Sequence, residues 1–103
     1  MSYQTIIDQL RNSLQTAYRQ GIDADAVLDQ LQQEGQGKFA AIFHQEAGFV
    51  TNANRFGPYI KELGDSLLSF EQQPDNAQLA KLVKQLELLF TTLGHFRNQV
   101  KGH

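Results

Sequence analysis

The chain has 103 residues, a formal net charge of -2, 41% hydrophobic residues, 19% charged residues and no cysteine. This length and apolar content predict one domain, residues 1–103, with a single modest core. The absence of cysteine excludes a disulfide framework, a thiolate nucleophile and cysteine-ligated metals. The sequence contains neither a signal-peptide pattern nor the run of about 18 apolar residues that a membrane span needs, so we expect a cytoplasmic protein.

The first expected helix follows Ser2, a residue type that often caps a helix N-terminus. Apolar residues then recur at alternating steps of four and three, which is typical of one face of a helix. The members of this stripe are Tyr3, Ile7, Leu10, Leu14 and Ala17, widened by Ile6 and Tyr18. Arg19 and Gly21 are typical of a helix C-terminus, so we expect the helix to end at Gly21.

Two weaker helices are expected next. The first runs from Asp23, a capping residue, to Gly35, with Ile22 packing against Val27 across the cap. The second runs from about Phe39 to Val50, after a glycine-rich joint.

The stretch from Phe49 to Phe70 carries an apolar seam that Gly57-Pro58 interrupts. The seam consists of Phe49, Ala53, Phe56, Ile60, Leu63, Leu67 and Phe70. Proline disrupts a helix interior but fits the first helical turn, where its missing N–H has no partner to lose. We therefore expect a break or a sharp bend between Asn52 and Pro58, that is two helices or one bent helix, with the helix after it running to about Gln72.

A turn at residues 73–76 separates this helix from the last one, which Asp75 or Asn76 is expected to cap. The apolar positions of the last helix are Leu79, Leu82, Leu86, Leu89, Leu93, Phe96 and Val100, widened by Val83 and Phe90. So short a turn makes the last two helices antiparallel neighbours. The predicted fold is all-α, a compact antiparallel helical bundle of four to five helices.

The segment from Tyr59 to Leu67, YIKELGDSL, followed by a leucine-rich helix, is similar to part of the helical N-terminal domain of the PriC family of bacterial replication-restart proteins. The similarity covers less than half of the chain and consists mainly of residues common in helices. No site residue and no function is transferred from it.

The histidines do not form a recognisable metal or catalytic motif. His44 and Glu46 are two residues apart, which places them on opposite sides of a helix. His95 and His103 are isolated, and the Glu-x-x-His pair of di-iron bundles is absent. We expect all three histidines to be structural or solvated.

The carboxylates also lack a motif. Asp23, Asp25 and Asp29 cluster without the glycine and distal glutamate of a calcium loop. The sequence contains no glycine-rich phosphate loop and no Gly-x-Ser-x-Gly nucleophile motif. We therefore expect no enzymatic activity, no cofactor and no metal.

The leading function hypothesis is a small non-catalytic interaction module, such as an adaptor, inhibitor or chaperone, whose partner is another protein or a second copy of the chain. The expected contact residues surround Gly57-Pro58, where a helix break leaves backbone polar groups free. They are Asn54, Arg55, Phe56 and Tyr59. In the alternative interpretation, Phe56 simply continues the core seam.

A nucleic-acid-associated factor of replication or regulation is the alternative function. It would require the fold to bring together the cations Arg55, Lys61, Lys81, Lys84, Arg97 and Lys101. Glu87 interrupts the basic side of the last helix, so binding to nucleic acid is less favoured than binding to protein.

Overall fold

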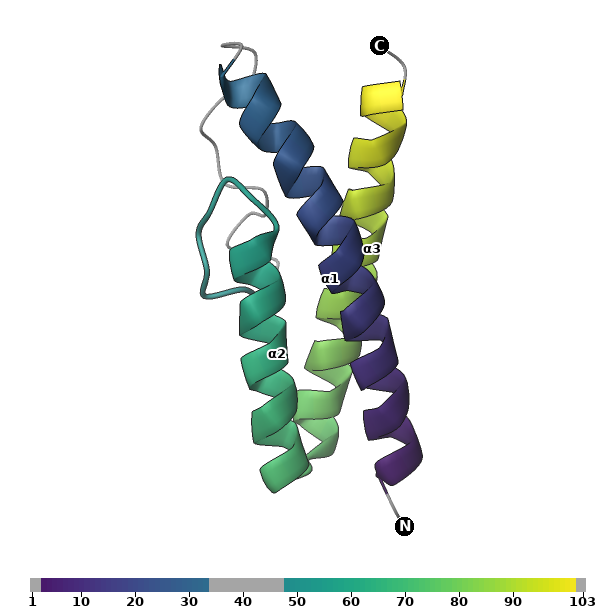
Figure 1. The fold of residues 1–103 in the computed structure, drawn as a ribbon. Coiled ribbons are helices and arrows are strands. Elements are labelled where there is room, and N and C mark those ends of the chain that lie inside the picture. Colours follow the sequence, from purple (N-terminus) through teal and green to yellow (C-terminus); the bar gives the residue numbers. More distant parts are fainter. Residues whose placement is uncertain (1–2, 34–47, 102–103) are drawn as a thin grey trace.

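The computed structural model describes residues 3–33 and 48–101, with side chains as far as Asn98 in the last helix. These residues form three helices, α1 (Gln4–Gln33), α2 (Gly57–Gln72) and α3 (Asn76–Lys101). α2 runs antiparallel to α1 and α3, and each helix contacts the other two (Figure 1). The all-α prediction is confirmed, whereas the predicted count of four to five helices is not.

α1 is one continuous helix of 30 residues, so the break expected at Gly21 is wrong. The apolar spacing continues through the glycine. The inward side of α1 carries Ile7, Leu10, Leu14, Ala17, Gly21, Ala24 and Leu28. Gly21 is buried because α2 packs directly against it: a Cβ atom at Gly21 would lie 2.4 Å from the Cδ1 atom of Ile60. The glycine permits a close helix contact and does not end the helix.

The boundaries expected for the last two helices are confirmed. α2 begins at Gly57 with Pro58 in its first turn. The Asp75 carboxylate caps α3 by accepting a hydrogen bond from the N–H of Ala77 at 3.3 Å. Both helix starts therefore follow from residues next to them in the sequence.

The core lies between the three helices and draws most of its largest side chains from α2 and the residue before it. The largest fully buried side chains are Tyr59, Phe56, Phe70, Leu63 and Leu89. At the end of the bundle near the α2–α3 turn, the ring of Tyr3 packs edge-on against Phe70, with centroids 5.5 Å apart. The Tyr3 hydroxyl donates a hydrogen bond to Asn76 Oδ1 at 2.9 Å, which attaches the start of α1 to that turn.

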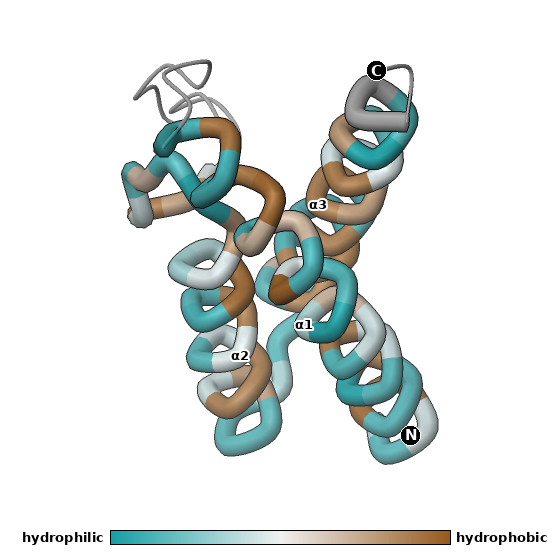
Figure 2. Tube along the Cα trace, turned by 45° about the horizontal axis from the view of Figure 1, so that its top comes forward, coloured by the Kyte–Doolittle hydropathy of each residue, from teal (hydrophilic) through white to brown (hydrophobic). Residues whose placement is uncertain are grey.

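The helix expected from Phe39 to Val50 lies mostly outside the described residues. Its described members, Gly48 to Val50, are not helical. The chain stays non-helical from there to the start of α2, so the break expected between Asn52 and Pro58 is confirmed. α2 has 16 residues whereas α1 has 30 and α3 has 26, and α1 and α3 diverge at the end away from the α2–α3 turn (Figure 2). Within the described ranges, no helix has both the length and the apolar character needed to cross a membrane.

Replacing Gly21 with alanine tests the close contact between α1 and α2. The same substitution at Gly94 in α3 is the matched control, because a Cβ atom there meets nothing within 4 Å. Both substitutions gain the same helix propensity, but only Gly21→Ala forces Ile60 to move. The displaced atom is the terminal Cδ1 methyl of Ile60, and the next neighbours of the added Cβ lie at 3.7 Å or more, so a change of rotamer relieves the clash. We expect Gly21→Ala to be about 0.5–1.5 kcal/mol less stable than Gly94→Ala in urea unfolding. Equal stability of the two variants would contradict the packing role of Gly21.

Candidate functional site: a groove between α1 and α2

The start of α2 is capped by a side chain from α1. The Asp25 carboxylate accepts hydrogen bonds from the backbone N–H groups of Phe56 at 2.6 Å and Gly57 at 2.9 Å. No helical carbonyl can satisfy these amides at a helix start, and a negative charge is favourable there. We expected the break before Pro58 to leave backbone groups free for a partner, but Asp25 occupies two of them.

The four contact residues predicted from the sequence divide into two pairs. Phe56 is 2% exposed and Tyr59 is fully buried, so both lie in the core and the alternative interpretation of Phe56 is confirmed. Asn54 and Arg55 are partly exposed, and Arg55 forms an ion pair with Asp29 of α1. Only Asn54 and Arg55 are therefore placed to meet a partner in this conformation.

Glu62 holds the segment before α2 from its other side. Its carboxylate accepts hydrogen bonds from the backbone N–H groups of Val50 at 2.9 Å and Thr51 at 2.7 Å. Burial raises the pKa of Glu62, but hydrogen bonds from Thr51 and Val50 and the charge of Lys81 together lower it more, so the pKa lies below its usual value.

Two further side chains fix this segment. Gln85 of α3, 4% exposed, donates a hydrogen bond to the carbonyl of Gly48 at 3.1 Å. The Tyr59 hydroxyl lies 3.0 Å from both the N–H and the carbonyl of Ala53. The segment is thus held by side chains from all three helices, which gives the start of α2 a defined position.

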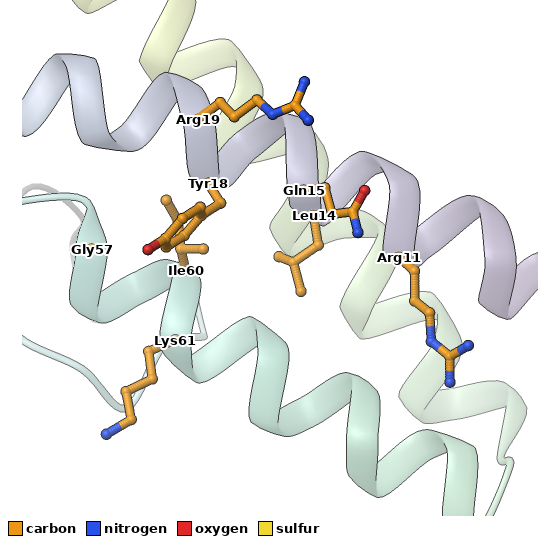
Figure 3. Close-up of a pocket in the computed structure, with 8 residues that line it drawn as sticks. All are labelled: Arg11, Leu14, Gln15, Tyr18, Arg19, Gly57, Ile60 and Lys61. Carbon is orange, nitrogen blue, oxygen red and sulfur yellow. The ribbon is translucent and has the colours of Figure 1, made fainter.

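A groove of about 580 Å³ lies between α1 and α2, beside this capped start. It is lined by Arg11, Leu14, Gln15, Tyr18 and Arg19 of α1 and by Gly57, Ile60 and Lys61 of α2. Leu14 points toward α2, and the Tyr18 ring lies over Ile60 (Figure 3). The floor of the groove is therefore apolar and includes an aromatic ring.

Tyr18 and Ile22 are exposed, contrary to expectation. Tyr18 was expected to widen the core stripe and Ile22 to pack on Val27, but they are 59% and 52% exposed. Since the buried stripe continues through Gly21, both residues fall on the edge of α1 beside α2, one turn apart. This continuing stripe was the sequence signal that could have found them.

The cations of the groove lie at its edges. Arg11 reaches across to Glu71 of α2 in an ion pair of 2.5 Å, which closes one end. Arg19 and Lys61 point away from the groove on opposite sides (Figure 3). Neither pairs with an acidic side chain of the described ranges. Among the described residues, the charged side chains that line the groove are therefore all cationic.

The cations considered for nucleic-acid binding are spread over separate surfaces. Lys81 and Lys84 line a groove that also contains Glu87. Arg97 lines another groove, between α1 and α3, whereas Lys61 belongs to the α1–α2 groove. The described part of the chain does not gather these cations on one face.

The remaining candidates add no metal or catalytic cluster. His95 is exposed on α3, whereas His44, His103 and the side chain of Lys101 lie outside the described residues. Among the residues that the structure describes, no three histidine, aspartate or glutamate side chains are grouped to hold a metal ion.

Asp25→Ala tests the cap on α2. This substitution removes the carboxylate that accepts hydrogen bonds from the N–H groups of Phe56 and Gly57. We therefore expect the free energy of unfolding to fall by about 0.5–2 kcal/mol. Asp23→Ala is the control, because Asp23 is exposed and lies about half a turn before Asp25 on the same helix. We expect it to change the free energy of unfolding by no more than about 0.5 kcal/mol. Equal effects in urea unfolding would contradict the capping role.

We expect the contribution of Glu62 to the stability of the fold to be lost at acidic pH. Because its pKa is lower in the folded protein than in the unfolded chain, its contribution is complete above the unfolded pKa and is lost as the pH falls through the folded pKa. We expect Glu62→Gln to make the loss of stability below about pH 5 less steep. A stability profile that is the same in both proteins, measured by urea unfolding from neutral to acidic pH, would contradict this.

Comparisons with protein-family models, with curated proteins and with solved structures find no match for this chain.

Proposed function

We propose that this protein is a non-catalytic protein-interaction module that binds its partner in the α1–α2 groove. The observation that carries the proposal is the position of Tyr18, a 59% exposed aromatic side chain on the edge of an apolar groove. Tyrosine and arginine are enriched at protein interfaces, and the energetically important residues are commonly aromatic side chains that a partner desolvates.

The surroundings of Tyr18 support this proposal. Ile22 extends the exposed apolar surface by one turn along α1. Leu14 and Ile60 line the groove beside the Tyr18 ring. Ile60 is only 5% exposed, so a partner that covers this surface removes apolar area from water mainly on α1.

Asn54 and Arg55 belong to the same proposed surface, at its edge. Both precede Gly57, which lines the groove, and both are partly exposed. Phe56 and Tyr59 take a supporting role, because their burial fixes the start of α2, which forms one wall of the groove. The proposed contact surface is thus centred on α1 and extends to two of the residues predicted from the sequence.

Tyr18→Ala separates binding from stability. Leu68→Ala is the control, because Leu68 on α2 is 58% exposed, almost the same as Tyr18, and does not line the groove. Neither substitution removes a buried side chain, so we expect both to change stability by no more than about 0.5 kcal/mol. We expect affinity capture from the native host, quantified by mass spectrometry, to lose its partner with Tyr18→Ala and to keep it with Leu68→Ala.

The double variant Tyr18→Ala, Ile22→Ala makes this test stricter. If every protein captured by the parent chain were captured equally by the folded double variant, the groove would not be the binding surface and the proposal would be wrong.

A further inference from the structure

Two cations that form no ion pair within the described residues lie on opposite edges of the groove. Arg19 projects from α1 and Lys61 from α2, both are exposed, and their side chains point to opposite sides (Figure 3). Between them, Leu14, Tyr18 and Ile60 form the floor. A ligand in the groove therefore meets apolar side chains along its middle and positive charge along both flanks.

The carboxylates at the two ends of the groove already have partners. Glu71 is paired with Arg11 at one end of the groove. Asp25, near Gly57 at the other end, accepts two backbone hydrogen bonds. Both carboxylates are thus engaged, whereas Arg19 and Lys61 form no ion pair with the described residues and can meet an acidic ligand.

The length of the groove also limits its occupant. The α1 wall extends from Arg11 to Arg19, which corresponds to about 12 Å, or two helical turns. An amphipathic helix presents apolar side chains at positions i, i+4 and i+7 over the same distance, with polar residues on both flanks. We infer that the groove takes an amphipathic helix of a partner protein whose apolar stripe is flanked on both sides by Asp or Glu, an inference that rests on the proposed interaction function.

A pair of designed peptides tests the charge of the occupant. The probe is a short, blocked helical peptide with leucine at the apolar positions and glutamate at both flanks, and the control has lysine in place of glutamate. We expect the full chain at low salt to bind the acidic peptide about tenfold more tightly than the basic one, by fluorescence anisotropy. Added salt should weaken binding of the acidic peptide, because both cations are exposed.

Charge reversal assigns the preference to the two cations. We expect the double variant Arg19→Glu, Lys61→Glu to bind the acidic peptide about tenfold more weakly than the parent and to prefer the basic peptide. The matched control is Lys84→Glu, Arg97→Glu, which makes the same change in net charge outside the groove. We expect this control to keep the preference for the acidic peptide, and circular dichroism confirms that both variants are folded.

Four outcomes would overturn the inference. The parent chain binds the two peptides equally; the control variant loses the preference as fully as the groove variant; labelled single-stranded DNA binds more tightly than the acidic peptide and is lost with Arg19→Glu, Lys61→Glu; or light scattering shows self-association that Tyr18→Ala abolishes. If the two peptides bind equally but affinity capture still finds a partner that depends on Tyr18, the inference of an acidic occupant is wrong and the proposed interaction function stands. If the two peptides bind equally and no captured partner depends on Tyr18, both the acidic occupant and the proposed interaction function are wrong.

Discussion

The close contact between Gly21 of α1 and Ile60 of α2 joins the two helices beside the groove. A β carbon at position 21 would lie 2.4 Å from the Cδ1 methyl of Ile60, so glycine lets the Ile60 side chain keep its present rotamer against α1. The contact brings Asp25, one turn later on α1, to the start of α2. Tyr18, almost one turn earlier on α1, lines the same groove as Ile60. The cap and the candidate binding surface therefore depend on the same close packing.

The candidate surface is supported by a rigid wall. Gly57 and Ile60, which line the groove, belong to the first turn of α2, where Asp25 accepts hydrogen bonds from the backbone. Glu62 and Gln85 hold the preceding segment on its other side. A partner in the groove would thus meet side chains whose positions are already fixed, which reduces the entropy lost on binding. The exposed side chains of Tyr18 and Arg19 remain able to adjust to it.

Much of the fold could be predicted from local sequence, but the site could not. Pro58 and Asp75 define helix starts through their own chemistry, so those boundaries were predicted correctly. Gly21 is ambiguous, because glycine is common both after a helix and at a close helix contact, and only the neighbouring helix distinguishes them. For the same reason, the burial of Tyr18 and Ile22 was predicted wrongly. A helix that is expected to end at residue 21 gives no indication that the apolar stripe continues beyond it. The role of Asp25 depends on a residue 31 positions away and has no local signal.

The distance along the chain between Asp25 and the amides it caps also bears on the order of folding. α2 and α3 are joined by a short turn, so their mutual contacts close a small loop, whereas α1 must close a much longer one to reach them. We therefore expect the α2–α3 hairpin to form early with the amides at the start of α2 still hydrated, and α1 to dock afterwards and dehydrate them. The groove comes into existence only with that final step, so under the proposed function the binding surface would form last.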